Sequence, residues 1–152
     1  MTDRTIAIVG ASLAGFRAAE ELRTEGFDGR LVVIGDEPHR PYDRPPLSKD
    51  VLGGRREPDE IVLSVAEPDL DLQIEWELGV RAERLDVAGR RIHLAGGRTL
   101  VFDGCVIATG ATPRRMPSWP DAKPGLHVLR NARQSSRLRS CLLYTSDAAD
   151  EL

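Results

Sequence analysis

Two kinds of hydrophobic spacing follow one another at the start of the chain and predict a strand, a helix and a second strand. Residues 6–9 form an unbroken apolar run that ends at Gly10, as expected of a buried parallel strand. From 13 to 25 the apolar positions return at helical spacing, and Gly26 is expected to end this helix. A second apolar run follows at 30–35. Two parallel strands joined by a helix form a right-handed unit, so this opening predicts an α/β fold.

The pattern is weaker after the second run. Residues 38–49 contain four prolines, and we expect no regular structure across most of them, with Pro45 holding Arg44 in an extended backbone. A short helix is expected at 47–52, stopped by two glycines. Three short elements are expected beyond it: a strand at 61–63, a helical turn at 64–70 and a strand at 73–78.

Alternating positions then predict an antiparallel meander. Its strands are expected at 81–86, 91–94 and 98–102, with turns at 88–90 and at the glycine pair 96–97. Residues 105–108 form another unbroken apolar run, as in a strand covered on both faces. A proline-rich linker is expected at 111–125, and a helix beginning at 132–139.

Composition excludes several classes of protein. The 152 residues suit one domain, and the net charge of −3 gives no case for binding nucleic acid or an acidic membrane surface. No apolar stretch reaches the roughly 18 residues of a membrane span, and no secretion signal precedes the first strand, so we expect a cytoplasmic protein. Cys105 and Cys141 suggest neither a disulfide framework nor a metal site, and the three scattered histidines are expected on the surface.

The turn between the first strand and the helix has the residues of a nucleotide-binding turn. Gly10, Ser12 and Gly15 occupy the three glycine positions of the Gly-x-Gly-x-x-Gly motif, with Ser12 replacing the middle glycine. The first N–H groups of a helix lack helical partners and carry partial positive charge, so phosphate oxygens bind there. The Cβ of Ser12 is expected to crowd the phosphates slightly, while its hydroxyl offers a hydrogen bond. An ordinary glycine-containing turn is the alternative.

Charged residues follow the second strand. Asp36 and Glu37 lie about 20 residues after the last glycine of the motif, where a carboxylate binds the ribose hydroxyls and repels a 2′-phosphate. Arg44 and Lys49, on the stiff proline-rich segment, are candidates to face a bound anion. The alternatives are solvated turn acids and a solvated basic pair.

Three segments together resemble a known family. Residues 10–15, 33–37 and 41–49 resemble the start of the FAD-dependent ferredoxin and rubredoxin reductases, flavoproteins with two dinucleotide-binding domains. The segment 41–49, which ends in Leu-Ser-Lys, is the specific part. The resemblance implies a Rossmann-like FAD-binding βαβ unit with a parallel sheet, crossed by an antiparallel β-meander. It covers residues 4–139, roughly the first third of a typical member, so we expect an incomplete domain.

The resemblance also implies site residues. The glycine turn would bind the pyrophosphate of FAD, Asp36 or Glu37 the ribose, and the backbone of Ala82 the adenine. Residues 129–131 resemble the family's Leu-Arg-Thr, whose arginine contacts FAD, with Asn131 replacing the threonine. Lys49, near the isoalloxazine, would be the catalytic residue and favour the negatively charged reduced flavin. The cofactor-binding residues expected are Gly10, Ser12, Leu13, Ala14, Gly15, Asp36, Glu37, Arg44, Lys49, Ala82, Ala108, Thr109, Gly110 and Arg130, and no metal ligands are expected.

The implied parent reaction passes electrons from NADH through FAD to an iron–sulfur ferredoxin or rubredoxin. We expect an FAD-binding segment at 1–112, a linker and the start of another segment at 113–140, and a non-native tail at 141–152, which resembles a translated sequencing adapter. The sequence contains no second glycine-rich unit for NADH, so we expect it to be inactive alone, with neither nucleic acid nor membrane as a partner.

Two other functions stay open. The same βαβ unit would serve an NAD-dependent dehydrogenase. The chain would otherwise be a non-catalytic fragment, in which the strand at 105–108 lacks its outer neighbour and exposes an apolar edge.

Overall fold

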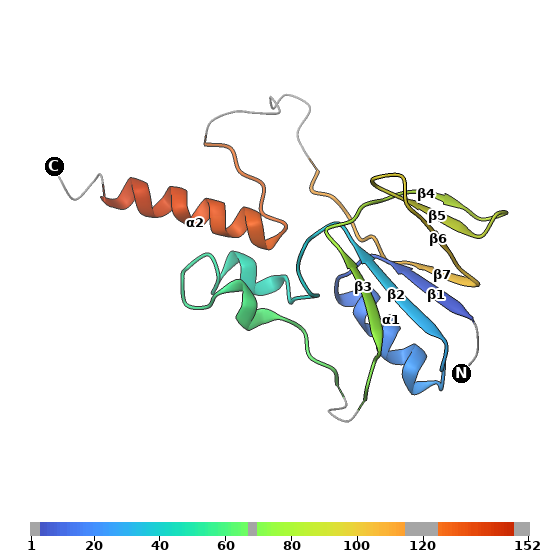
Figure 1. The fold of residues 1–152 in the computed structure, drawn as a ribbon. Coiled ribbons are helices and arrows are strands. Elements are labelled where there is room, and N and C mark those ends of the chain that lie inside the picture. Colours follow the sequence, from blue (N-terminus) through green and yellow to red (C-terminus); the bar gives the residue numbers. More distant parts are fainter. Residues whose placement is uncertain (1–3, 67–69, 115–124, 148–152) are drawn as a thin grey trace. The chain divides into compact units, whose positions relative to one another are not determined.

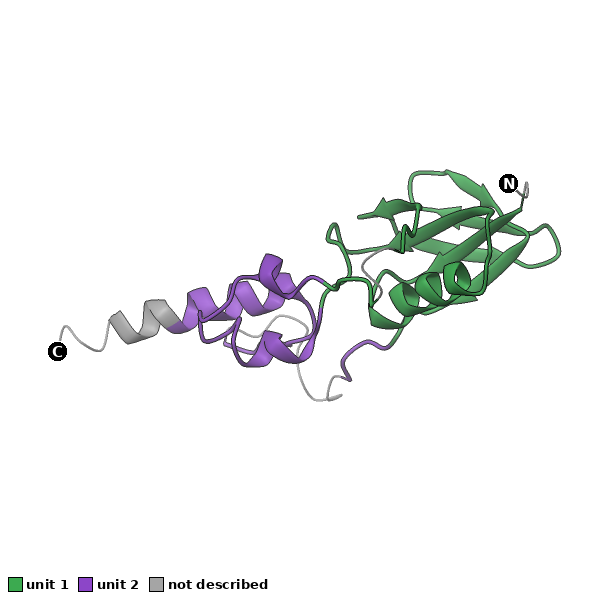
Figure 2. Ribbon diagram, turned by 90° about the horizontal axis from the view of Figure 1, so that it is seen from below, with its two compact units in different colours: residues 1–42, 63–110 green, residues 43–62, 111–152 purple. Residues whose placement is uncertain are grey.

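The computed structural model, which describes residues 4–66, 70–114 and 125–147, divides the chain into two units (Figure 2). Unit 1 comprises residues 1–42 and 63–110, and unit 2 comprises residues 43–62 and 111–152.

A parallel sheet forms the centre of unit 1. The predicted strand–helix–strand opening is confirmed as β1 (Thr5–Val9), α1 (Leu13–Thr24) and β2 (Arg30–Gly35). Two later strands, β3 (Ile74–Leu78) and β7 (Gly104–Ile107), complete a sheet of order β3-β2-β1-β7, in which every pair is parallel.

The predicted meander is confirmed as a second sheet. Its strands are β4 (Ala82–Asp86), β5 (Arg91–Leu94) and β6 (Thr99–Val101), paired antiparallel in that order. The chain therefore leaves the parallel sheet after β3, runs through the meander and returns as β7, as the resemblance implies.

The period-2 alternation of the strands separates two cores in unit 1. One face of the parallel sheet packs against the meander, and the other packs against α1 (Figure 1). The meander-side core contains Ala7, Val32, Ile34, Ile92, Leu94 and Phe102, and the helix-side core contains Ile8, Ala19, Leu31 and Val33. Unit 1 thus has three layers, because successive residues of β1 and β2 point to opposite faces.

Arg23, near the C-terminal end of α1, forms hydrogen bonds to the loops that precede β2 and β3. Arg23 Nε donates to the carbonyl of Leu72 at 2.8 Å, and its Nη1 donates to the carbonyls of Phe27 and Gly29 at 2.6 and 3.0 Å. Carbonyls at the entries to β2 and β3 therefore share one guanidinium.

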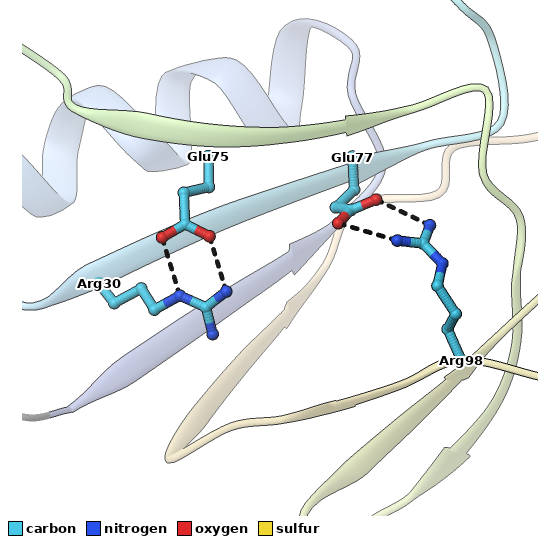
Figure 3. Close-up of polar contacts among 4 residues, drawn as sticks. All are labelled: Arg30, Glu75, Glu77 and Arg98. Carbon is cyan, nitrogen blue, oxygen red and sulfur yellow. Dashed lines mark hydrogen bonds and ion pairs between the residues drawn. The ribbon is translucent and has the colours of Figure 1, made fainter.

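Two bidentate ion pairs lie along β3 (Figure 3). Arg30 donates to Glu75 at 2.9 and 2.6 Å, and Arg98 donates to Glu77 at 3.2 and 2.8 Å. The hydrogen bond from Arg30 lowers the pKa of Glu75 and raises that of Arg30. Because Arg98 belongs to the β5–β6 turn, its pair links the two sheets of unit 1.

β7 forms one edge of the parallel sheet. Cys105 and Val106 are half-buried, and Ile107 is 66% exposed, so the strand is not covered on both faces as the apolar run predicts. The expected apolar edge is present, because among the described strands only β1 pairs with β7.

Unit 2 packs short 3₁₀ helices against a longer helix. These elements are η1 (Pro45–Ser48), η2 (Pro58–Ile61) and α2 (Ala132–Asp147). The hydroxyl of Ser135, which is fully buried, donates to the carbonyl of Leu47 at 2.7 Å, and Arg139 pairs with Glu57 at 2.8 Å. The buried apolar side chains of this unit include Leu47, Val51, Ile61 and Ala132.

The predictions for residues 43–66 are partly wrong. Arg44 has a helical backbone (φ −82°, ψ −34°), because its carbonyl accepts the N–H of Leu47 at 3.0 Å and starts η1 two residues before the predicted helix. Ile61 ends η2, so no strand covers 61–63. The predicted helical turn is absent at 64–66, where the Ala66 N–H donates to the buried Glu20 at 2.8 Å, and 67–69 lie outside the described residues.

The remaining predictions concern the last part of the chain. Residues 111–114 have no regular structure, and most of the expected linker lies outside the described residues. α2 begins at the predicted position and continues to Asp147, across the start of the expected tail. The boundaries predicted at 112 and 140 remain predictions. No helix in the described parts of the chain is long and apolar enough to cross a membrane.

Candidate functional site

The predicted nucleotide-binding segments of unit 1 meet at one edge of the parallel sheet. In the strand register Val9 pairs with both Ile34 and Ile107, and Gly35 pairs with Leu78. The residues that follow these strands therefore leave the sheet at the same edge, which is where open α/β sheets bind ligands.

Gly10 makes the turn from β1 possible. Its φ is +123°, and a Cβ placed on it would lie 2.1 Å from the carbonyl oxygen of Ala108. Its N–H donates to the carbonyl of Ile34 at 2.8 Å, and the Ala108 N–H donates to the carbonyl of Val9 at 2.7 Å. The end of β7 thus contacts the turn directly, and only glycine fits between them.

The start of α1 is packed against this turn. A Cβ on Gly15 would lie 1.9 Å from the Gly10 carbonyl oxygen. The first helical hydrogen bond runs from the Phe16 N–H to the Ser12 carbonyl at 2.9 Å, so the amides of Leu13, Ala14 and Gly15 have no acceptor within the helix. These amides can therefore bind an anion at this edge.

Ser12 takes the middle-glycine position without backbone strain. It is the N-cap residue with extended backbone (φ −133°, ψ −168°), and its side chain makes no capping hydrogen bond to α1. Leu13, the next residue, is half exposed. A side chain at position 12 is thus compatible with the turn.

The structure distinguishes the two acids that the sequence treats alike. Glu37 Oε2 accepts a hydrogen bond from the Tyr42 hydroxyl at 2.6 Å, and the Glu37 carbonyl accepts the Gly79 N–H at 3.0 Å. Asp36 is exposed at the end of β2. Glu37 is therefore tied into its own loop, whereas Asp36 presents its carboxylate to solvent.

Ala82, Thr109 and Gly110 are the other predicted residues of unit 1. Ala82 is half-buried and packs against the meander-side core, which includes Ile34 near the end of β2. Thr109 and Gly110 are exposed after β7, and Gly110 has a φ of +69°.

The three predicted basic residues lie in unit 2. Arg44 Nη1 donates to the carbonyl of Arg130 at 2.7 Å, so these two residues are adjacent. Lys49 is exposed directly after η1. Arg44 and Arg130 are thus brought together within unit 2, and Lys49 is exposed on the same unit.

The position of Arg130 depends on the capping of α2. Asn131 Oδ1 accepts the Gln134 N–H at 2.9 Å, while Gln134 Oε1 accepts the N–H groups of Arg130 and Asn131 at 2.7 and 3.2 Å. This reciprocal arrangement is a capping box, in which asparagine and threonine serve alike. The replacement of the family's threonine by Asn131 therefore keeps the local structure.

Sequence reasoning missed Gly35 and Tyr42. A Cβ on Gly35 would lie 2.5 Å from that of Ala11, so glycine at the end of β2 lets the turn after β1 pack closely. Tyr42 is 6% exposed and holds Glu37. The available signal was weak: a glycine before two acids, and a tyrosine within the proline-rich segment.

A cavity of about 520 Å³ in unit 1 is separate from this edge. Thr5 and Arg30, at the amino ends of β1 and β2, line it, as do Glu77 and Arg98, and no predicted nucleotide-binding residue does. Both guanidiniums are engaged by glutamates, which leaves no evident anion site. Among the described residues, no cluster of three or more His, Cys, Asp or Glu side chains could hold a metal ion.

Comparisons with known proteins show the family of the chain. Residues 4–144 match the pyridine nucleotide-disulphide oxidoreductase family. The chain is 44% identical over 141 residues to the ferredoxin–NAD(+) reductase component of the biphenyl dioxygenase system of Paraburkholderia xenovorans, covering 91% of this chain and 34% of that protein. It is 36% identical to rhodocoxin reductase of Rhodococcus erythropolis, covering 93% and 33%.

Solved structures give the same picture. The covalent putidaredoxin reductase–putidaredoxin complex superposes with a TM-score of 0.80 at 28% identity, covering 93% of this chain and 35% of that chain. The ferredoxin reductase for the CYP199A2 system of Rhodopseudomonas palustris gives 0.79 at 35% identity, covering 91% and 34%. The chain thus spans about a third of the length of the relatives it matches.

Proposed function

Because the chain belongs to the pyridine nucleotide-disulphide oxidoreductase family, we propose that it is the FAD-binding part of a ferredoxin or rubredoxin reductase. The parent protein would pass electrons from NADH through FAD to an iron–sulfur ferredoxin or rubredoxin. The names of the relatives support this proposal, since they are a ferredoxin–NAD(+) reductase component and rhodocoxin reductase. The observation that carries it is the shared edge at which the turn, the acids and the end of β7 meet.

The residues at this edge fit the ADP half of FAD. The amides of Leu13, Ala14 and Gly15 are without helical acceptors and suit the pyrophosphate, while the exposed Asp36 suits the ribose diol. Ser12 would add a hydroxyl at the phosphates. Bound FAD would accept a hydride and release electrons singly, and the protein would bind and orient it.

The other predicted residues have supporting roles in this proposal. Backbone at Ala82 would line the adenine, and the small residues Ala108, Thr109 and Gly110 would allow the dinucleotide to approach the end of β7. Arg44 and Arg130, which are adjacent in unit 2, would supply positive charge.

Lys49 would act on the redox chemistry by placing an ammonium near the isoalloxazine. Replacing Lys49 by Met is expected to lower the reduction potential of bound FAD, because positive charge stabilises the electron-rich form. Spectroelectrochemical titration of the two flavin-loaded proteins measures the shift. An unchanged potential would remove this role while leaving FAD binding intact.

FAD binding tests the proposed function. The 152-residue chain, purified and incubated with FAD, is expected to retain the flavin after gel filtration, with the yellow absorbance of a flavoprotein in a 1:1 ratio. Asp36→Asn should weaken this binding, and Glu25→Gln, which makes the same change of charge at an exposed position at the C-terminal end of α1, is the control. A colourless protein that binds NADH instead would support a dehydrogenase. Binding of neither would indicate a non-catalytic fragment.

We further propose a cytoplasmic location, the compartment that supplies NADH to such a reductase. Fractionation of cells that express the chain, followed by immunodetection, would test it.

A further inference from the structure

We propose that Tyr42 and Glu37 form a clamp that positions Asp36 for the adenosine ribose, and that Glu37 is not itself the ribose ligand. This inference rests on the proposed FAD site and assigns the roles of the two adjacent acids within it. Tyr42 is then a positioning residue that acts through the loop after β2.

The loop is fixed on both sides of Asp36. Before it, the Gly35 carbonyl accepts the Val80 N–H at 2.9 Å. After it, the Glu37 carbonyl accepts the Gly79 N–H at 3.0 Å. Asp36 thus lies between two backbone anchors to the chain that leaves β3, and its own carboxylate is exposed.

The side chain of Glu37 adds a third anchor. Its Oε2 accepts the Tyr42 hydroxyl at 2.6 Å, a distance typical of a hydrogen bond to a charged carboxylate. Tyr42 is 6% exposed, so packing holds its ring and hydroxyl in place. The clamp therefore joins position 37 to a buried residue five positions later.

These contacts give the two acids different roles. A carboxylate oxygen directed at a buried tyrosine is oriented into the loop, whereas the exposed carboxylate of Asp36 is presented to solvent where the nucleotide is expected. Because the loop is already restricted before binding, it loses less conformational entropy when the ribose binds. Loss of the Tyr42 hydroxyl should then weaken only the interaction between Asp36 and the ribose hydroxyls.

The test compares two ligands that differ only in those hydroxyls. Dissociation constants of ADP and of 2′,3′-dideoxy-ADP for the 152-residue chain are measured by isothermal titration calorimetry, and their ratio reports hydroxyl recognition. Hydrogen bonds to a charged group predict a ratio of about tenfold or more for the unmodified chain. Asp36→Asn should reduce the ratio towards one, and Tyr42→Phe should reduce it severalfold.

The double variant shows through which acid Tyr42 acts. In the Asp36→Asn background, Tyr42→Phe should leave the ratio unchanged, because the residue that it positions is already disabled. A further fall in that background would show that Glu37 binds the ribose and would overturn the inference. Glu37→Gln keeps an acceptor for the tyrosine and should keep most of the ratio, whereas Glu37→Ala should match Tyr42→Phe.

Other outcomes separate this inference from the proposed function. If Tyr42→Phe weakens both ligands equally, the residue is merely structural and the clamp has no role in positioning. If ADP binds with a clear ratio that Tyr42→Phe does not change, the inference fails and the nucleotide site stands. If the unmodified chain binds no ADP, the proposed site and the inference fail together. Circular dichroism of each variant confirms that it is folded.

Discussion

Glycine is required at Gly10 both for its positive φ and for its close contact with the end of β7. At Gly26 only the first reason applies. Gly10 and Gly26 both have positive φ, +123° and +83°, a region that L side chains rarely adopt. A Cβ on Gly10 would also meet the Ala108 carbonyl, while a Cβ on Gly26 would have no atom within 4 Å apart from those of the adjacent residues. The pair therefore separates the effect of backbone conformation from that of close packing.

Substitution of these two glycines by alanine should give unequal losses of stability. Gly26→Ala is expected to cost about 1–2 kcal/mol, the price of a left-handed backbone. Gly10→Ala should cost about 3 kcal/mol or more, since the new methyl also forces the end of β7 away from the turn. Urea unfolding followed by circular dichroism compares them. Equal losses would mean that the contact with Ala108 relaxes freely.

The Arg30–Glu75 pair gives stability a small pH dependence. Its hydrogen bond lowers the pKa of Glu75 in the folded state, so the pair stabilises the fold above the carboxyl's unfolded pKa. That contribution is lost as pH falls through the lowered, folded pKa. Both side chains are about half exposed, so Glu75→Gln should cost less than about 1 kcal/mol at neutral pH.

Urea midpoints of the Glu75→Gln and unmodified chains, measured across acidic pH, would check this expectation. The difference should vanish at the acid end. A difference that persists below the folded pKa would come from packing instead of charge.

At this scale the sequence predicts the residues whose role is local. Gly10 and Gly15 follow from their spacing in one turn. Asp36 and Glu37 are indistinguishable by spacing, because their difference depends on the orientation of Tyr42 in a bend that no periodicity describes.

Elements with strong hydrophobic periodicity form where the sequence predicts them, and elements governed by local hydrogen bonds do not. β1, β2 and the meander follow apolar alternation that burial enforces. Around η1, the bias of proline against a helical backbone at Arg44 is overcome by the bond from the Leu47 N–H, and prolines at the first helical positions suit a helix start. Hydrophobic periodicity does not show which of these two local effects determines the backbone at Arg44.

The cap of α2 is an element whose strength can be measured directly. Asn131→Ala removes the acceptor of the Gln134 N–H and is expected to destabilise the helix by about 1 kcal/mol. Asn131→Thr, which restores the family's residue, should retain most of the stability. Hydrogen exchange of the amides in the first turn of α2 is the measurement. Faster exchange in the threonine variant than in the alanine variant would contradict the capping role.

At the scale of the whole molecule, β7 is an aggregation liability, because among the described strands only β1 pairs with it and its other side forms an edge of the sheet. Exposed apolar strand edges invite pairing between chains, and Ile107 places an aliphatic side chain on this edge. The apolar run that forms β7 was predictable, but its coverage was not, because coverage depends on strands that are distant in sequence.

Ile107→Lys should therefore reduce aggregation with little change in the free energy of unfolding. Val87→Lys is the matched control, since Val87 is 71% exposed but lies in the β4–β5 turn, outside the strands. Static light scattering during storage at high concentration measures the effect. Equal benefit from both lysines would point to net charge as the cause.

The position of β1 within its sheet has a consequence for synthesis on the ribosome. β1 pairs on one side with β2, which soon follows it, and on the other with β7, where Thr5 and Asp103 are joined across 98 residues. At translation speeds of roughly 5–20 residues per second, β7 is synthesised on the order of 5–20 s after β1, and until then one side of β1 has no partner strand. In the nascent chain, the backbone N–H and C=O groups of β1 that face β7 would thus be unpaired outside the exit tunnel. A chaperone that binds unpaired strands would protect them.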